Sequence, residues 1–235
     1  MRLIDEQYTM TPFYGYRRMT VYLQNLGFSV NHKRVRRLMR RLGLEAIYPK
    51  PNLSRAGKDH LTYPYLLKGA AVEYSDQVWA SDITYIRIGS GFVYLLVIMD
   101  WHSRFVIEME VSNSLEASVF VETLKRAIKK GKPKIFNSDQ GSQFTAIEWL
   151  KILQENGIVI SMDGRGRCFD NIFVERLWRT VKYEEVYLKE YADVWQLEES
   201  LRQYFEFYNY HRPHQSLNYQ TPFEAYQKGR ANRTK

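Results

Sequence analysis

Three acidic residues, Asp82, Asp139 and Glu175, have the types and surroundings that metal-dependent phosphoryl chemistry needs. Asp82 interrupts an extended, mostly apolar segment, where an ionised carboxylate is costly to bury without a cation or a hydrogen-bond donor. Carboxylates that share a site repel one another unless a metal ion neutralises them. Oxygen ligands suit Mg²⁺ or Mn²⁺, and two such ions about 3.5–4 Å apart can bind both oxygens of an in-line displacement at phosphorus. The three acids therefore suggest a catalytic site that holds two ions.

Each of these acids also has an ordinary interpretation when it is taken alone. Asp82 could be a solvated or capping residue, Asp139 opens the turn-like stretch DQGSQF, and Glu175 could be an exposed helix acid. Asp100 begins a predicted hairpin turn, where aspartate commonly bonds to nearby backbone groups. We therefore expect a structural role for Asp100 and leave both interpretations open for the other three.

The helix around Glu175 has two distinct faces. Three apolar residues share the face that should pack on a sheet: Val174, Leu177 and Val181. Glu175, Arg179 and Lys182 follow one another at i, i+4 and i+7, which places them on a second stripe. An acid for metal followed by two cations for DNA phosphate is what a DNA-cutting site needs. An exposed Glu–Arg pair on an ordinary helix is the alternative.

The chain around the acids alternates between extended and helical patterns. Strands are predicted at 78–88, 92–99, 104–111, 134–137 and 158–161, and helices at 115–130 and 146–156, before the helix that carries Glu175. Ser114 and Asp170 stand where they could cap helices. Short turns join the first three strands and helices separate the later ones, which predicts an α/β fold: a mixed sheet with helices on its faces. Asp139 then follows the fourth strand, at the edge where ligands of such sheets collect.

The first fifty residues have a helical pattern. Helices are expected at 14–26 and 32–42, each ending at a glycine, with Asn31 as the N-cap of the second. Six cations crowd the second helix, among them Arg36, Arg37 and Arg40. This favours a helix-turn-helix that binds DNA over a solvated basic face. Residues 48–75, with three prolines and two glycines, are typical of a linker.

The composition narrows the class of protein. The 235 residues include 34 Lys and Arg against 26 Asp and Glu, and the net charge of +8 favours a polyanionic partner, with nucleic acid ahead of an anionic membrane. A single cysteine excludes an intrachain disulfide and fits a reducing compartment. The longest apolar run, residues 92–99, is far shorter than the ~20 residues that span a bilayer. We therefore expect a cytoplasmic protein with no membrane partner.

Five stretches of this sequence carry a family resemblance. They are YGYRRMTVYL, VWASDITYI around Asp82, FNSDQGSQFT around Asp139, SMDGRGRCFDNIFVERLWRTVKYEEVYL around Glu175, and YNYHRPHQSLNYQTPFEAY. Thirty-five residues separate Asp139 from Glu175. The sequence resembles the second-frame (OrfB) transposases of bacterial insertion sequences, whose core is similar to retroviral integrases and ribonuclease H. The resemblance implies a ribonuclease-H-like catalytic core with a helical extension at 76–228, after a helix-turn-helix-like segment at 1–47 and a linker at 48–75.

The resemblance also assigns roles to residues. It implies that Asp82, Asp139 and Glu175 bind the metal ions and that Lys182 holds DNA phosphate. The C-terminal Asn-x-x-Arg-Pro-His signature is matched by four residues: Asn209, Arg212, Pro213 and His214. For Arg212 a DNA contact and a structural role both stay open.

A DNA transposase of this family cleaves a strand to free a 3′ end, and the 3′ hydroxyl then attacks a second phosphodiester. The expected partners are transposon-end and target DNA, further copies of this chain on that DNA, and an upstream-frame (OrfA) protein, separate or fused. The expected location is the bacterial cytosol, with the nucleoid. A nuclease that cuts without joining, and a DNA-binding remnant without catalysis, are the rival functions.

Two features depart from related sequences. A single cysteine and five dispersed histidines exclude the His-His-Cys-Cys zinc module with which retroviral integrases begin. The chain also starts close to the YGYRR stretch, where family members usually carry more residues. We therefore expect a shortened product or a remnant and do not assume that it recognises transposon ends on its own, while the expectation for the active site is unaffected.

Overall fold

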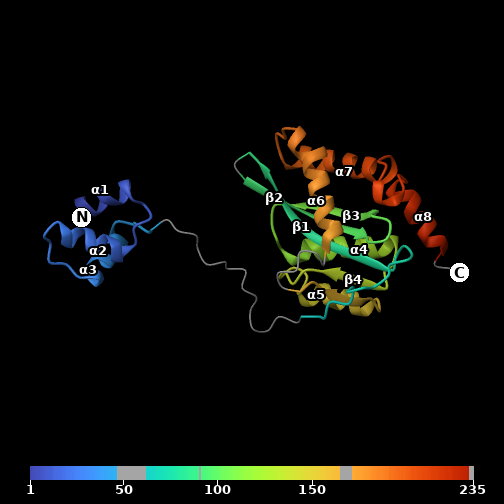
Figure 1. The fold of residues 1–235 in the computed structure, drawn as a ribbon, viewed down its shortest axis with the longest axis horizontal. Helices are drawn as coiled ribbons and strands as arrows, with labels where there is room; N and C mark the ends of the chain where they lie inside the picture. The colour runs from blue at the N-terminus through green and yellow to red at the C-terminus, as the bar shows by residue number, and fades with distance from the viewer. Residues whose placement is uncertain (47–61, 90, 165–170, 233–235) are drawn as a thin grey trace. The chain divides into compact units, whose positions relative to one another are not determined.

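The computed structural model describes residues 1–46, 62–89, 91–164 and 171–232, and the chain falls into two compact units, Met1–Arg55 and Ala56–Lys235 (Figure 1). The first unit is helical and the second is built around a sheet. Each unit has its own hydrophobic core. Within the described part of the chain, no helix has both the length and the apolarity needed to cross a bilayer.

The N-terminal unit contains three short helices: α1 (Arg2–Met10), α2 (Tyr16–Asn25) and α3 (His32–Arg41). Apolar residues from all three form its core: Ile4, Met19, Leu23, Val35 and Met39. The side chain of Asn31 accepts a hydrogen bond from the Arg34 backbone N–H at 2.9 Å, which confirms the predicted N-cap of α3. Gly27 and Gly43 follow α2 and α3 with φ of +85° and +70°, as the predicted helix ends require.

Five strands of the described chain form one mixed sheet in the order β3-β2-β1-β4-β5. They are β1 (Val78–Ile88), β2 (Gly91–Asp100), β3 (Val106–Ser112), β4 (Ile135–Ser138) and β5 (Val159–Met162). The first three pair antiparallel, while β4 runs parallel to both β1 and β5. This confirms the predicted α/β architecture, in which hairpin-joined strands precede strands separated by helices.

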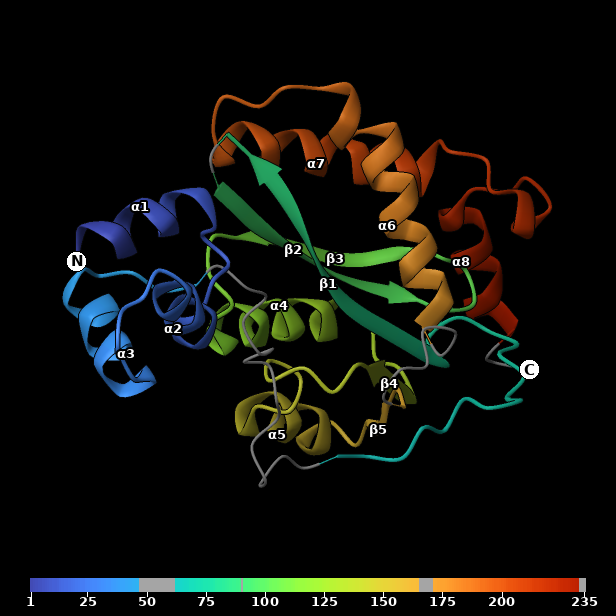
Figure 2. The ribbon, with the colours of Figure 1, turned by 60° about the vertical axis from the view of Figure 1, so that its left-hand side comes forward.

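Helices cover both faces of the sheet (Figures 1 and 2). One hydrophobic cluster packs α4 (Ala117–Lys130), α5 (Ile147–Glu155) and Tyr226 of α8 (Pro222–Asn232) against one face. The other cluster packs α6 (Ile172–Glu184) and α7 (Val194–Tyr210) against the opposite face. Two short 3₁₀ turns, Val186–Leu188 and Gln215–Leu217, lie between the C-terminal helices.

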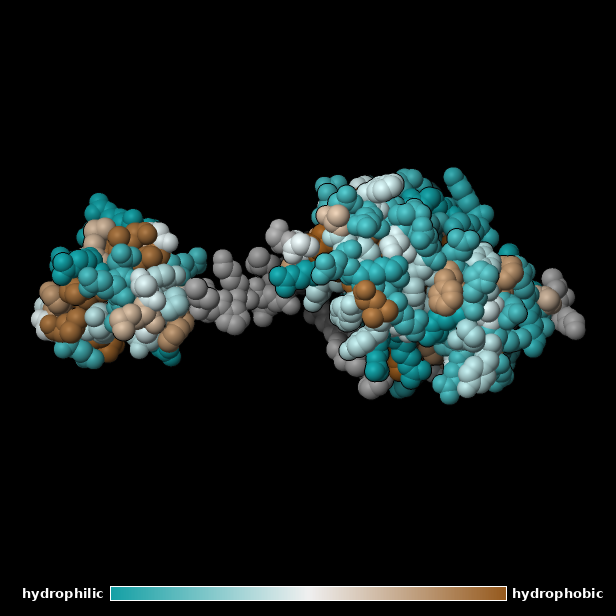
Figure 3. Space-filling model, turned by 90° about the horizontal axis from the view of Figure 1, so that it is seen from above, coloured by the Kyte–Doolittle hydropathy of each residue, from teal (hydrophilic) through white to brown (hydrophobic). Residues whose placement is uncertain are grey.

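The surfaces of the two units differ in character. Figure 3 shows brown, hydrophobic areas that are larger relative to the size of the N-terminal unit than those on the sheet-based unit. Apolar side chains that are exposed in the first unit include Met10, Phe13 and Val21. A unit of this size cannot bury all its apolar residues, because its ratio of surface to volume is high.

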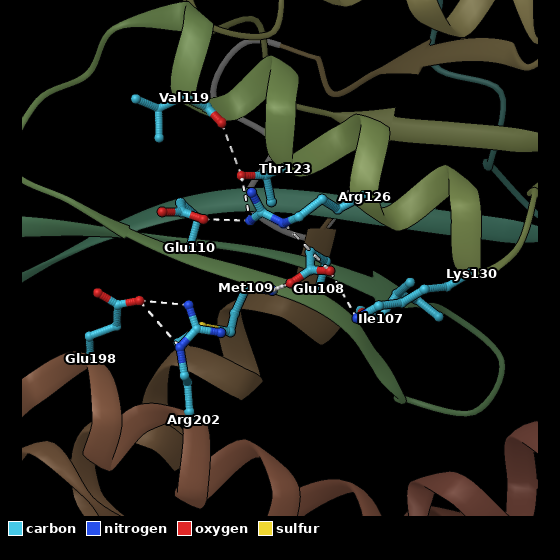
Figure 4. A network of polar contacts seen from close by, with 10 residues as sticks. All are labelled: Ile107, Glu108, Met109, Glu110, Val119, Thr123, Arg126, Lys130, Glu198 and Arg202. Atoms are coloured by element: carbon cyan, nitrogen blue, oxygen red, sulfur yellow. Dashed lines mark hydrogen bonds and ion pairs between the residues drawn. The ribbon is translucent and has the colours of Figure 1, made fainter.

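Charged side chains cover the edge strand β3. Figure 4 shows Arg126 and Lys130 of α4 pointing toward Glu108 and Glu110 of β3. Lys130 Nζ lies 2.8 Å from a Glu108 carboxylate oxygen, and Arg126 pairs with Glu110. An unpaired strand edge invites pairing with other chains, and paired charges of this kind discourage it.

The predicted start of one helix needs correction. The predicted helix at 115–130 begins later, at Ala117, and its N-cap is Glu116 with no side-chain cap bond, so Ser114 is not the cap. The predicted cap Asp170 lies outside the described residues, and Asn171 occupies the N-cap of α6. Residues 62–75, expected as linker, contact the sheet-based unit: the Leu67 side chain is buried in its core and the Leu66 N–H bonds to Ser161 Oγ.

Candidate active site and nucleic-acid-binding residues

Strand β1 holds Asp82 on the face of the sheet that α6 covers. Successive side chains of a strand alternate between faces, so Asp82 shares its face with Val78 and Ala80, which pack in the α6–α7 core. The Asp82 carboxylate accepts two hydrogen bonds, one at 2.8 Å from the Trp178 indole N–H and one at 2.8 Å from the Ile83 backbone N–H. These two donors fix the orientation of the carboxylate.

Strand β4 delivers Asp139 to the same end of the sheet. Strands β1 and β4 are parallel neighbours, and Ala80 lies opposite Asn137 in their register. Asp82 and Asp139 each lie two residues beyond that pair, so the two acids occupy corresponding positions along the neighbouring strands. Asp139 Oδ1 accepts a hydrogen bond from the Gly141 backbone N–H at 2.8 Å. A Cβ at position 141 would lie 2.9 Å from that oxygen, so a larger residue there would displace the Asp139 carboxylate.

Helix α6 carries Glu175 in its first turn, and the helix is anchored by its apolar face. Val174, Leu177 and Val181 are all buried in the core against the sheet, as the sequence predicted. Glu175 itself is exposed. The helix is thus fixed in place while its acid stays accessible from solvent.

The three acids influence one another electrostatically. Burial raises the pKa of Asp82 to about 6, the bonds from Trp178 and Ile83 oppose this, and the charges of Asp139 and Glu175 raise it further. Burial also raises the pKa of Asp139, against the hydrogen bond from Gly141. The charges of Asp139 and Glu175 are therefore near enough to Asp82 to disfavour its ionised form, as expected where a cation is meant to bind.

The three side chains have the chemistry of metal ligands, but their placement does not by itself enclose a metal ion. The donor set is all oxygen, which suits Mg²⁺ and Mn²⁺. Nevertheless, no group of three His, Cys, Asp or Glu side chains among the described residues is placed to enclose a metal ion. Both oxygens of Asp82 accept hydrogen bonds, from Trp178 and from the Ile83 N–H, and one oxygen of Asp139 accepts a bond from Gly141. The second oxygen of Asp139 and the carboxylate of Glu175 are therefore the more accessible ligands.

Two of the predicted phosphate-binding cations lie beside tyrosine rings. Lys182 Nζ is 5.6 Å from the centre of the Tyr85 ring on β1. The guanidinium carbon of Arg179 is 5.9 Å from the centre of the Tyr183 ring, on the same helix. Both cations are on the helix that carries Glu175, on the C-terminal side of it.

The predicted DNA-binding arginines of α3 lie on the surface of the N-terminal unit. Arg36, Arg37 and Arg40 are exposed. The Arg36 guanidinium lies 5.5 Å from the centre of the Tyr16 ring. Arg36 and Arg40 also line an open groove of about 800 Å³ between α2 and α3. Their side chains are therefore available to a ligand of this unit.

Arg212 has a protein partner. Its guanidinium donates two hydrogen bonds, at 2.8 and 2.6 Å, to the Glu184 carboxylate at the end of α6. Nearby Asn209 donates to and accepts from the Val106 backbone, at 3.0 and 2.9 Å. These contacts favour the structural interpretation of the C-terminal signature, and a DNA contact by Arg212 stays a prediction.

Trp178 is a site residue that was not predicted from the sequence. The sequence does contain a hint of its role. A buried tryptophan needs an acceptor for its N–H, and Trp178 lies three residues after Glu175 on the same helix. The expectation for Asp100 is confirmed: its carboxylate accepts bonds from the Asp76 N–H and from the Ser103 N–H and hydroxyl.

Comparison with known protein families agrees with this organisation. The family described as "Integrase core domain" matches residues 73–168, and a second family of the same description matches residues 156–222. The family described as "HTH-like domain" matches residues 1–52. The N-terminal unit is thus helix-turn-helix-like, and the sheet-based unit is an integrase core.

Individual proteins extend the likeness over most of the chain. The putative transposase InsK for insertion sequence element IS150 of Escherichia coli (strain K12) is 34% identical over 90% of this chain and 76% of its own length. The transposase for insertion sequence element IS904 of Lactococcus lactis is 31% identical over 91% of this chain and 88% of its own length.

Solved structures share the fold. The HTLV-2 integrase catalytic core domain in complex with magnesium aligns with a TM-score of 0.53 at 18% identity, over 65% of this chain and 97% of that one. A simian T-cell lymphotropic virus intasome in complex with PP2A regulatory subunit B56 gamma aligns with a TM-score of 0.59 at 15% identity. The alignment covers 95% of this chain and 74% of that one. The core is therefore ribonuclease-H-like, and the chain belongs to the bacterial insertion-sequence transposases of the second-frame (OrfB) type, which act in DNA transposition.

Proposed function

We propose that this transposase cleaves and rejoins DNA strands at an Asp-Asp-Glu site made of Asp82, Asp139 and Glu175. The observation that carries the proposal is the matched position of Asp82 and Asp139 on neighbouring parallel strands. The raised pKa of Asp82, to which both other acids contribute, supports a site meant for a cation. When bound there, Mg²⁺ or Mn²⁺, as one or two ions, stabilises charge on phosphate and activates the attacking oxygen.

The chain's own groups orient the carboxylates. Trp178 and the Ile83 N–H hold Asp82, and the Gly141 N–H holds Asp139. Glu175 is exposed on a helix whose apolar face packs on the sheet, and its charge contributes to the raised pKa of Asp82. Such fixed donors keep ligands oriented in most metal sites.

Cations on two surfaces bind the DNA. Lys182 and Arg179 follow Glu175 along α6, where they contact phosphates next to the scissile bond. Arg36, Arg37 and Arg40 of α3 bind DNA phosphates from the helix-turn-helix-like unit. The expected assembly is several copies of this chain on transposon-end and target DNA in the bacterial cytosol, with an upstream-frame protein as a further partner.

The proposal is tested with purified protein, labelled DNA carrying the end of the insertion sequence, and Mn²⁺. Wild-type protein should nick the end and join it to a second DNA. Asp82→Asn, Asp139→Asn and Glu175→Gln should each abolish both steps without unfolding the protein, because each keeps the shape of the side chain and removes a charge that binds metal.

Glu148→Gln is the matched control, since Glu148 is an exposed acid in the first turn of α5, a helix that packs on the face of the sheet opposite to α6. It should cleave like the wild type. Normal nicking by one of the three variants would remove that residue from the site. Nicking without joining by the wild type would indicate a nuclease, and binding alone would indicate a remnant.

A further inference from the structure

Four aromatic side chains are exposed close to the proposed active site. Tyr85 and Phe92, on the β1–β2 hairpin, are 64% and 56% exposed. Their ring centres lie 5.7 Å apart at 90°. Tyr183 and Tyr187, at the end of α6 and just beyond it, are 65% and 64% exposed, with ring centres 5.4 Å apart at 78°. Large rings left open to solvent in pairs usually serve binding and not folding.

A cation accompanies each pair. Lys182 lies over Tyr85 and Arg179 lies over Tyr183. Lys182 and Tyr183 lie three and four residues after Arg179 in α6, so both neighbour it on the helix surface and the helix links the two pairs into one aromatic and cationic surface. We call this set of six residues the aromatic platform.

The aromatic platform starts a short distance from the acids. Tyr85 is three residues beyond Asp82 on β1, or roughly 10 Å at 3.3 Å per residue, and its side chain leaves the opposite face of the strand, where the Lys182 ammonium reaches its ring. Tyr183 is eight residues beyond Glu175 on α6, or roughly 12 Å at 1.5 Å per residue. Since bases along one DNA strand rise by about 3.4 Å each, both distances correspond to three or four nucleotides.

We propose that the aromatic platform binds unpaired bases of the transposon end, three or four nucleotides from the scissile bond. The proposal rests on the proposed function, because that function places the scissile phosphate at the acids. Paired bases hide their faces inside the duplex, whereas unpaired bases can stack on exposed rings, and nearby cations hold the backbone. The platform therefore recognises a melted end by stacking and not by base sequence.

Charge favours nucleic acid over a protein partner for this surface. The two acids at the C-terminal end of α6 are already paired, Glu184 with Arg212 and Glu185 with Lys189. Lys182 and Arg179, the two cations of the platform, thus have no nearby free acid on that part of the helix. A surface of open rings and cations suits a flexible polyanion.

The test compares forked DNA, in which the last four base pairs of the element end are mismatched, with the fully paired end. A 2-aminopurine base in the unpaired strand reports stacking through quenching of its fluorescence. All proteins carry Asp82→Asn, so that binding is measured without cleavage. The platform variants are Tyr85→Ala and Tyr183→Ala, with Tyr85→Phe and Tyr183→Phe as conservative partners. Tyr219→Asn is the matched control, because Tyr219 is 70% exposed and has a φ of +62° that asparagine tolerates.

Each alanine variant should abolish quenching and weaken binding of the fork about tenfold, within the range measured for loss of one stacked base. Binding of the paired end should stay unchanged. The phenylalanine variants and the Tyr219 control should behave like the parent protein. Equal weakening on both DNAs, or retained quenching in the alanine variants, would overturn the proposal. A change of oligomeric state in light scattering with quenching unaffected would instead make the surface a protein contact.

The outcome is separable from that of the proposed function. Cleavage by the wild type in Mn²⁺ without any quenching would leave the function standing and remove the platform. Quenching by a protein whose wild type never cleaves would support the platform and remove the proposed function.

Discussion

Asp82 is an ionisable group in a place that favours its neutral form. Burial raises its pKa to about 6 from an ordinary value of 3.8, and the neighbouring carboxylates Asp139 and Glu175 add to the effect. Between these two pH values the folded protein holds a proton that the unfolded chain has lost. The free energy of unfolding of the metal-free protein should therefore fall as the pH rises from about 4 to about 6.

Replacing this carboxylate should stabilise the metal-free protein. At pH 7.5 in a chelator, Asp82→Asn should raise the free energy of unfolding by about 1–2 kcal/mol, since one pKa unit corresponds to about 1.4 kcal/mol. Melting followed by circular dichroism from pH 4 to 8 measures this. Below pH 4 the two proteins should melt alike, and Mn²⁺ should stabilise only the wild type. Identical melting at pH 7.5 in the chelator would contradict the prediction.

Trp178 should set the metal affinity through Asp82. Trp178→Phe keeps an aromatic ring in the core and removes the N–H that the Asp82 carboxylate accepts at 2.8 Å. Loss of a group that orients a metal ligand typically weakens binding about 10- to 100-fold. Titration of the metal-free protein with Mn²⁺, followed by calorimetry, should show such a loss.

Trp149→Phe is the control for this experiment. Trp149 is fully buried in the core on the other face of the sheet, and its indole nitrogen has no hydrogen-bond partner among the described residues. Its substitution should lower stability and leave Mn²⁺ affinity unchanged. Unchanged affinity in the Trp178 variant would mean that the ring only packs.

At the scale of elements, helix α7 and the segment after it tie the far edge of the sheet to α6. The Asn209 side chain satisfies both the N–H and the C=O of Val106, at the start of the edge strand β3. Arg212 binds Glu184 at the end of α6 with two hydrogen bonds, and the arginine holds the pKa of Glu184 below its ordinary value. The C-terminal signature thus connects two elements that hold the site.

The two residues should contribute unequally to stability. Asn209→Ala leaves two backbone groups of Val106 unpaired in a buried place, which should cost about 2–4 kcal/mol. Arg212→Ala breaks an ion pair that solvent partly screens, so about 1 kcal/mol is expected. Urea unfolding measures both, and Arg212→Lys should restore part of the loss.

DNA binding separates the two interpretations of Arg212. If its role is structural, the salt dependence of DNA affinity should be the same in Arg212→Ala as in the wild type. A log–log slope reduced by about 0.9 would instead indicate one lost phosphate contact.

The sequence predicts the elements better than the contacts between them. The β-branched and aromatic residues of β1, the continuous apolar run of β2 and the glycines at 27 and 43 are local signals, and the strands and helix ends they predict are present. Asp139 could be placed at a strand end for the same reason. The bond from Trp178 to Asp82 spans 96 residues, and no local pattern specifies which side chain will face which. The start of α4 was misplaced because Ser114 has cap chemistry, while packing of the apolar face decides where the helix begins.

At the scale of the whole chain, the two units have separate cores of very different size. Five buried residues form the core of the N-terminal unit, whereas two large clusters on either side of the sheet form the core of the other. Units of about 60 residues or fewer bury too little surface to be more than marginally stable. DNA or a partner that binds the small unit would therefore contribute much of its stability.

Separate cores predict separate thermal transitions. Differential scanning calorimetry of the full chain should show a small transition for the N-terminal unit below a larger one for the integrase core. Met19→Ala should lower the midpoint temperature of only the first transition, because truncating a buried methionine costs about 2–5 kcal/mol in that core alone. Mn²⁺ should raise the midpoint temperature of only the second transition, because it binds the carboxylates of the integrase core. Transposon-end DNA should raise the midpoint temperature of the first transition, because a ligand stabilises the folded unit that it binds. The triple substitution Arg36→Gln, Arg37→Gln and Arg40→Gln should remove that increase. A single transition that Met19→Ala lowers as a whole would show that the units fold as one.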